Sequence, residues 1–157
     1  CQVSTTLYNA VLRSNLDVSE RHNHMFTVGY VPLGMDAAVS YGYADLVFRN
    51  TTKYPLLIHA SVSDGHRLTF SIRATNDTPN LKVRLATKTI PPPLRYIDDP
   101  SRPQGTAVVL ENGSTGYVVD TYMKIFNGDI LIREEKLHRS IYQMLPTKII
   151  RGTSPVY

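Results

Sequence analysis

The residues whose side chains are best suited to catalysis lie near the start of the chain. The only cysteine, Cys1, directly precedes a stretch whose apolar spacing predicts a helix. A thiol at a helix N-terminus lies near unpaired N–H groups and the positive end of the helix dipole, and both favour the nucleophilic thiolate. His22 and His24 are two positions apart, so on an extended strand both rings point to the same face. We expect one of them to reach the sulfur as general base.

Two carboxylates complete this candidate group. Asp36 and Asp45 each begin a predicted strand, where a carboxylate can orient an imidazole and hold its tautomer. The sequence therefore predicts Cys1 as nucleophile, a histidine as base and one of the two aspartates as the orienting group. A structural alternative stays open, because a lone cysteine is often a small buried hydrophobic residue. In that case the histidines are surface residues and the aspartates belong to turns.

Composition narrows the class of protein. The 157 residues, 42% of them apolar, suffice for one ordinary domain or two small ones. The net charge of +4 is spread along the chain, so nucleic acid is not an expected partner, whereas an anionic cell wall suits a mildly basic surface. No cofactor is expected. A metal site of Cys1, His22 and His24 is disfavoured because their spacing lacks the compactness of a structural zinc site.

The apolar pattern predicts one helix followed by strands. Apolar residues recur at helical spacing over residues 4–16, and extended stretches separated by turns follow. We therefore expect an N-terminal helix packed on an antiparallel β meander. The predicted strands of the meander cover residues 26–31, 37–41, 45–49, 56–62 and 67–73. A change in composition places a domain boundary near residue 78, which divides the chain into domains 1–78 and 79–157.

The second half is predicted to contain strands and turns. One short strand precedes a proline-rich segment, and β-prone stretches follow at 106–110, 117–126 and 130–133. The dipeptide Asn127-Gly128 is a strong hairpin signal between the last two stretches. No helix is required in this half. The predicted fold class is therefore α+β, with an extended all-β module after the helix and meander.

An ordered set of motifs runs through the first half of the chain. The motifs are CQVSTTLYNA at 1–10, Glu20-Arg21-x-x-His24, Tyr30-Val31-Pro32-x-Gly34-x-Asp36-Ala37 and Asp45-x-x-Phe48-x-Asn50. With them, residues 1 to about 75 resemble the VanW family, named from a vancomycin-resistance gene cluster and found in bacterial envelope proteins. The resemblance implies an extracellular, envelope-associated location. Because the family's glycine-rich lead-in is missing, it also implies a C-terminal fragment whose membrane attachment is a missing N-terminal anchor. His24 occupies the motif position, which favours it over His22, although Met25 stands where the family usually has serine.

Spaced glycines mark the second half. They are Gly105, Gly113, Gly116, Gly128 and Gly152. Their order resembles that of a G5 domain, a β-rich extracellular module. The resemblance implies a thin, extended sheet with little hydrophobic core. This agrees with the physical role of glycine, which supplies positive φ in turns and lets backbones approach closely.

Two functions are compatible with these features. The first is a bacterial cell-envelope protein that binds peptidoglycan or a related wall glycan or peptide. The alternative is a cysteine-dependent peptidoglycan-modifying enzyme that performs acyl transfer or hydrolysis with Cys1, His24 and Asp36 or Asp45. The order of these residues is similar to that in papain-like and transglutaminase-like enzymes. Fast alkylation of Cys1 by iodoacetamide, abolished by His24→Ala, would indicate the enzyme.

Other aromatic and titratable residues have ordinary predicted roles. Tyr30, Tyr41, Tyr43 and Tyr54 lie near the motif residues and could stack on sugar rings, but packing in a core or sheet is the expected role of each. His138 lies within a run of charged residues, where we expect a solvated edge. The sequence predicts no oligomeric state.

Overall fold

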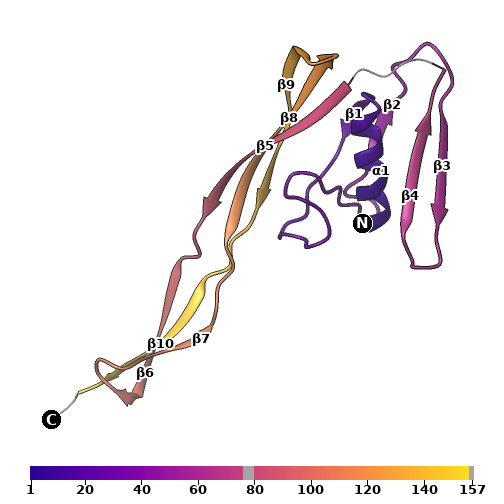
Figure 1. Ribbon diagram of the computed structural model, residues 1–157. Helices are drawn as coiled ribbons and strands as arrows, with labels where there is room; N and C mark the ends of the chain where they lie inside the picture. The colour runs from indigo at the N-terminus through magenta and orange to yellow at the C-terminus, as the bar shows by residue number, and fades with distance from the viewer. Residues whose placement is uncertain (76–79, 156–157) are drawn as a thin grey trace. The chain divides into compact units, whose positions relative to one another are not determined.

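The computed structural model describes residues 1–75 and 80–155, which form one helix and ten strands. In chain order the elements are α1 (Gln2–Arg13), β1 (Asp17–Glu20), β2 (Val47–Arg49), β3 (Leu57–Val62), β4 (Leu68–Arg73), β5 (Asn80–Ile90), β6 (Leu94–Pro103), β7 (Ala107–Glu111), β8 (Gly116–Asn127), β9 (Ile130–Tyr142) and β10 (Thr147–Ser154). The strands form sheets of order β1-β2, β3-β4, β5-β8-β9 and β6-β10-β7 (Figure 1). Within the described residues, no helix has the length and apolar character needed to cross a membrane.

The described residues divide into two compact units. The first unit comprises Cys1–His24, Val28–Ala86 and Val119–Ser140. The second comprises Met25–Thr27, Thr87–Val118 and the segment from Ile141 onward. Strands β5, β8 and β9 therefore contribute residues to both units. The boundary predicted near residue 78 lies outside the described residues and stays a prediction.

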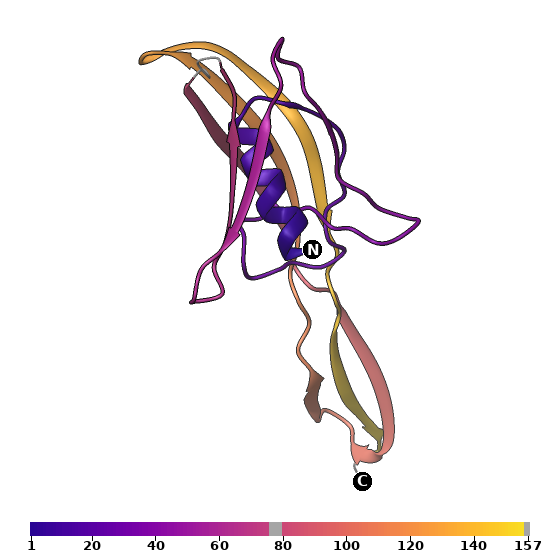
Figure 2. The same cartoon turned by 90° about the vertical axis from the view of Figure 1, so that its right-hand side faces the viewer.

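Helix α1 ends in a Schellman motif. The N–H of Leu16 donates to the carbonyl of Val11 at 3.4 Å, and that of Asn15 donates to the carbonyl of Leu12 at 3.2 Å. Asn15 has a φ of 54°, a conformation that asparagine adopts more readily than most residues. The predicted helix is confirmed, with both of its ends shifted toward the N-terminus relative to the predicted range 4–16. In the first unit α1 lies against β4 (Figures 1 and 2).

The hydrophobic core of the first unit joins the helix to strands from late in the chain. Tyr8 and Leu12 of α1 pack with Met35, Ala37 and Met123, and all five side chains are buried. Partly buried residues surround them: Val18, Val31, Leu46, Leu81, Val83, Leu85, Ile125 and Leu137. Full burial of one large apolar side chain contributes about 1.5–3 kcal/mol. Strands after residue 80 therefore stabilise the helix that begins the chain.

Three of the five strands predicted for the first half are present. The ranges 45–49, 56–62 and 67–73 correspond to β2, β3 and β4. A turn joins β3 to β4, where the N–H of Ser63 donates to the carbonyl of Arg67 at 3.1 Å. The predicted meander is correct only in part, because β1-β2 and β3-β4 are separate two-stranded sheets.

Two predicted strands are absent from the described residues. Residues 26–31 form bends and loop, and residues 37–41 contribute only the isolated bridges His22–Ala38 and Ser40–Ala44. Proline at position 32, which has no N–H to donate, follows the first of these stretches. The loop around Asp36 is held by side-chain contacts instead of strand pairing. Alternating apolar residues therefore did not lead to a β-strand here.

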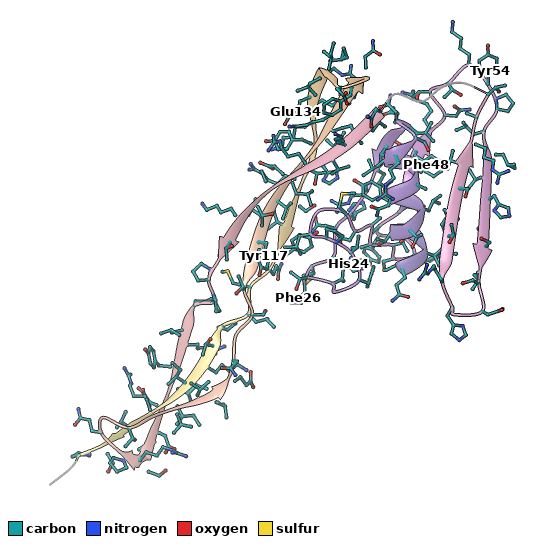
Figure 3. All side chains as sticks on the ribbon, viewed as in Figure 1. His24, Phe26, Phe48, Tyr54, Tyr117 and Glu134 are labelled. Atoms are coloured by element: carbon teal, nitrogen blue, oxygen red, sulfur yellow. The ribbon has the colours of Figure 1, made fainter. Side chains whose placement is uncertain are left out.

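The second unit contains the sheet of order β6-β10-β7. Strand β10 pairs in parallel with β6 and antiparallel with β7. Side chains project from both faces of this sheet (Figure 3). Val108, Val109 and Leu110 on β7 are each about half exposed. A Cβ on Gly113 or Gly152 would overlap backbone oxygen atoms of neighbouring segments. These glycines therefore permit close backbone approach, in agreement with the expected thin sheet.

Candidate functional site

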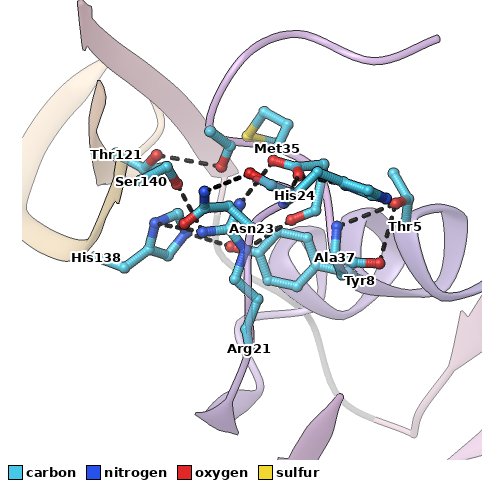
Figure 4. A network of polar contacts seen from close by, with 12 residues as sticks. Thr5, Tyr8, Arg21, Asn23, His24, Met35, Ala37, Thr121, His138 and Ser140 are labelled. Atoms are coloured by element: carbon cyan, nitrogen blue, oxygen red, sulfur yellow. Dashed lines mark hydrogen bonds and ion pairs between the residues drawn. The ribbon is translucent and has the colours of Figure 1, made fainter. Parts of the chain in front are cut away.

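A buried carboxylate organises the polar interior of the first unit. Asp36 is fully buried, and its carboxylate accepts hydrogen bonds from Arg21 and His24, two residues that Figure 4 labels in this network. Its Oδ1 accepts from an Nη of Arg21 at 2.9 Å, and its Oδ2 accepts from the backbone N–H of His24 at 2.7 Å. Nδ1 of His24 lies 2.6 Å from the same Oδ2. This carboxylate therefore holds the orientation of the imidazole ring.

Gly34 positions the loop that carries this carboxylate. It has a φ of 84°, and a Cβ there would come within 2.7 Å of Oγ1 of Thr121. The hydroxyl of Thr121, on β8, donates to the carbonyl of Gly34 at 3.3 Å. Only a residue without a side chain fits both the backbone conformation and the contact. The loop is thereby fixed against β8, two positions before Asp36.

Arg21 connects the carboxylate to strand β9. Its side chain is only 4% exposed. Its Nε donates to the backbone carbonyl of Asp36 at 2.6 Å, and an Nη donates to Oγ of Ser140 at 2.7 Å. The guanidinium also lies over the ring of Tyr8, at 5.5 Å from its centroid. A buried charge of this kind requires its anionic partner, which Asp36 supplies.

His138 completes the network from β9. An Nη of Arg21 lies 3.4 Å from its Nδ1, and its Nε2 makes a short hydrogen bond with the hydroxyl of Tyr8. Because a guanidinium can only donate, Nδ1 is the acceptor and the Nε2–H of the neutral ring donates to Tyr8. Burial lowers the pKa of His138 to about 4, with a further lowering by the charge of Arg21, while Asp36 acts in the opposite direction. The expected solvated position of His138 is therefore wrong.

The residues predicted to form a cysteine-based site are only partly brought together. The structure pairs His24 with Asp36. The thiol of Cys1 is exposed and donates to the carbonyl of Val39 at 3.7 Å. Asp45 accepts from the N–H of its neighbour in the chain at 2.8 Å. No contact among the described residues joins the thiol to the imidazole, so the catalytic role of the four residues stays a prediction.

Sequence reasoning missed Arg21, Tyr8 and His138 as members of one site. Arg21 and Tyr8 appeared only within the motifs of the first half, and His138 is 117 positions from Arg21. Spacing signals act within one helix or strand, so they do not report a contact between β9 and Arg21, the residue that follows β1. No signal marked His138, which lies in a charged run beyond the predicted strand 130–133.

A cavity of about 530 Å³ adjoins this network. It is lined by the end of α1, by β1 and the residues beside it, by Thr51 and by β9. Tyr8, Arg21 and His138 all contribute to its wall. The cavity falls within the usual range of ligand pockets, about 300–1,000 Å³. It therefore offers a concave binding site with apolar and polar walls.

A second feature of the first unit is a turn that presents two tyrosines. Tyr41 and Tyr43 are almost fully exposed, so the expectation that they pack in a core or sheet is wrong. They flank Gly42, whose φ is 76°. The ends of the turn are joined by hydrogen bonds in both directions between Ser40 and Ala44, at 2.9 and 3.0 Å. This hydrogen-bonded turn therefore exposes two aromatic rings to solvent.

The fold and these sites define a helix-containing α+β unit and an all-strand module. Residues 1–73 match the family described as VanW like protein, and residues 82–154 match the G5 domain. The chain therefore contains a VanW-like domain followed by a G5 domain, which confirms both predicted resemblances. Over 65 residues the chain is 50% identical to the Uncharacterized protein YoaR of Bacillus subtilis (strain 168), covering 41% of this chain and 22% of that protein. The chain thus spans about a fifth of that relative's length.

Two solved G5 structures are also similar. The HP0197-G5 crystal structure matches with a TM-score of 0.35 and 18% identity, over 48% of this chain and 100% of that chain. The IgA1 Protease G5 domain structure matches with a TM-score of 0.36 and 20% identity, over 52% of this chain and 99% of that chain.

Proposed function

We propose that this chain binds peptidoglycan or a related polymer of the bacterial cell wall. A VanW-like domain followed by a G5 domain fits a cell-wall-associated protein. The net charge of +4 is compatible with an anionic wall. The observation that carries the proposal is the exposed pair Tyr41 and Tyr43 on its hydrogen-bonded turn. Aromatic rings combine an apolar face with a polar end, which suits them to contact with sugar rings.

Co-sedimentation with purified peptidoglycan tests this function. The wild-type chain is expected to sediment with the polymer, and the double variant Tyr41→Ala, Tyr43→Ala is expected to bind more weakly. If each ring contributes about 0.5–1.5 kcal/mol, the loss is roughly 5- to 150-fold in affinity. The matched control Tyr41→Phe, Tyr43→Phe keeps both rings and should stay within about twofold of wild type. Wild-type protein that remains in the supernatant would refute wall binding.

Binding is favoured over the cysteine-dependent alternative for a geometric reason. An acyl-transfer mechanism needs the base within hydrogen-bond reach of the nucleophile. The thiol of Cys1 instead contacts the backbone carbonyl of Val39, and no contact of the described residues joins it to the imidazole of His24. The paired imidazole and carboxylate connect the Asp36 loop to the segment that follows β1. A wall-binding protein needs no thiol, and the proposal does not depend on one.

A further inference from the structure

One face of the β5-β8-β9 sheet packs on the core of the first unit. Five odd-numbered residues of β5 and β8 lie on that side: Leu81, Val83, Leu85, Met123 and Ile125. Successive side chains of a strand point to opposite faces of its sheet, so the even-numbered residues of the same stretches point away from the core. We call this second side the outer face. On β5 and β8 it consists of Lys82, Arg84, Asp120, Tyr122, Lys124 and Phe126.

Ion pairs connect β9 to the other two strands on the outer face, and in them each carboxylate is shared by two cations. The pairs are Arg84–Glu134, Lys124–Glu134, Lys136–Asp120 and Arg139–Asp120. Glu134, which joins the first two pairs, is labelled in Figure 3. Because two positive charges meet one negative charge, each of the two groups keeps a charge of +1.

Lys82 adds a third positive charge to the outer face. Its ammonium lies over the ring of Phe126, at 4.9 Å from the centroid, and forms no ion pair with a described residue. The described residues of the outer face therefore have a net charge of +3, compared with +4 for the whole chain. Positive charge that is spread along the sequence is thus concentrated by the fold on one face of one sheet.

Aromatic rings and shared carboxylates order these cations. The guanidinium of Arg84 lies over the ring of Tyr122, at 3.9 Å from the centroid. A cation–π contact of this kind contributes about 0.5–1 kcal/mol at an exposed site. The four cations of the ion pairs still keep 30–55% of their side chains exposed. They can therefore bind an external anion, and their ordering reduces the entropy that such binding costs.

The three positive groups follow one another along the sheet. Lys82 lies beside Phe126 near one end of β8, and Lys136 and Arg139 lie beside Asp120 nearer the other end. The group around the other carboxylate lies between them. From residue 120 to residue 126 there are six steps of about 3.3 Å, which give about 20 Å. A linear polyanion can contact all three groups at once, whereas a small anion reaches only one.

From these observations we infer that the outer face binds a linear anionic polymer of the cell wall whose backbone is joined by phosphodiesters. The inference rests on the proposed function for the location of this partner. The charge of such a polymer belongs to its backbone and recurs at every repeat, so it can match positive groups distributed along the sheet. Carboxylates on the peptide branches of peptidoglycan do not form such a row. Arginine is also suited to phosphate, which it contacts through two parallel hydrogen bonds.

Binding of fluorescently labelled poly(glycerol phosphate), measured by polarisation, tests the inference. The double variant Lys82→Gln, Arg139→Gln removes two cations of the outer face and leaves Asp120 paired with Lys136. The control Lys53→Gln, Arg67→Gln removes two exposed cations elsewhere, so both proteins have the same net charge. We expect the first variant to bind at least 10-fold more weakly than wild type and the control to stay within twofold. Equal losses in the two variants would overturn the outer face as the site.

The salt dependence of the same binding tests its electrostatic origin. If three phosphate contacts release counterions as single-stranded nucleic acid does, wild type should lose about 20-fold in affinity between 50 and 200 mM salt. Affinity that does not change with salt would contradict the inference. Single-stranded DNA or polyglutamate that binds as tightly as poly(glycerol phosphate) would also overturn it, because the face would then select neither a wall polymer nor phosphate.

Sedimentation with peptidoglycan stripped of its anionic polymers separates this inference from the proposed function. Wild-type protein that sediments but does not bind poly(glycerol phosphate) would remove the outer-face site and leave peptidoglycan binding intact. Wild-type protein that stays in the supernatant, yet binds poly(glycerol phosphate) in a manner sensitive to Lys82→Gln, Arg139→Gln, would support the outer face and remove the peptidoglycan site at Tyr41 and Tyr43.

Discussion

Acidification tests the buried position of His138 in the polar network. Burial and the charge of Arg21 lower the pKa of this imidazole from 6.5 to about 4 in the folded protein, although Asp36 opposes the change. In the unfolded chain the ring takes up its proton near pH 6.5. Between pH 6.5 and about 4 the unfolded state therefore binds more protons than the folded state. Stability is expected to fall as the pH falls through this window and to change no further through His138 below it.

The size of the effect follows from the two pKa values of His138. They differ by about 2.5, and each pKa unit corresponds to 1.36 kcal/mol, which gives an upper value of about 3 kcal/mol. Because the ring keeps some solvent exposure, we expect a loss of about 2–3 kcal/mol between pH 7 and pH 4. This is a large fraction of a typical domain stability of about 5–15 kcal/mol.

Urea unfolding at pH 7 and pH 4 measures this loss. Wild type should lose about 2–3 kcal/mol more than His138→Gln, which cannot take up the proton. His59→Gln, at an exposed position on β3, should behave as wild type does. An NMR titration of the His138 ring in wild type gives the pKa without any variant. A ring that titrates near pH 6.5, or equal losses in wild type and His138→Gln, would refute the reasoning.

Two substitutions test the interior of the first unit and the sheet of the second. Asp36→Asn leaves the buried Arg21 without its charged partner and should cost about 3–5 kcal/mol of unfolding free energy in urea. Asp17→Asn breaks an exposed pair and should cost less than about 1 kcal/mol, so equal losses would contradict the buried role. Gly152→Ala should cost about 1–3 kcal/mol in thermal unfolding, because its Cβ overlaps neighbouring backbone. Gly65→Ala meets open space, and a similar loss there would argue against close packing at Gly152.

Local patterns in the sequence were sufficient to predict the elements whose structure depends on interactions between nearby residues. The opening helix followed from apolar spacing, although it ends at Arg13 rather than at residue 16. The hairpin of β8 and β9 followed from Asn127-Gly128, where Gly128 has a φ of 58°. These features depend on residues close together in the chain, so a single sequence contains the information.

The candidate site was predictable from the sequence only in part. His24 and Asp36 were both identified, and an aspartate was expected to orient the ring, but sequence left Asp36 and Asp45 as equal alternatives. The structure distinguishes them because Asp36 is buried beside Arg21, whereas Asp45 lies at the surface of its turn. Burial of a carboxylate depends on which distant segments cover it, and no local pattern encodes that.

Strands β8 and β9 explain why the family segments and the compact units do not coincide. The VanW-like segment ends at residue 73, but its helix buries Tyr8 against Met123, and Arg21 bonds to Ser140. Both partners lie within the G5 segment 82–154. Removing them would expose apolar surface of α1 and leave a buried guanidinium with fewer acceptors, each a substantial cost. The spaced glycines therefore identify the G5 sequence pattern. Strands β8 and β9 of that same segment also pack against α1 and form part of the core of the first unit.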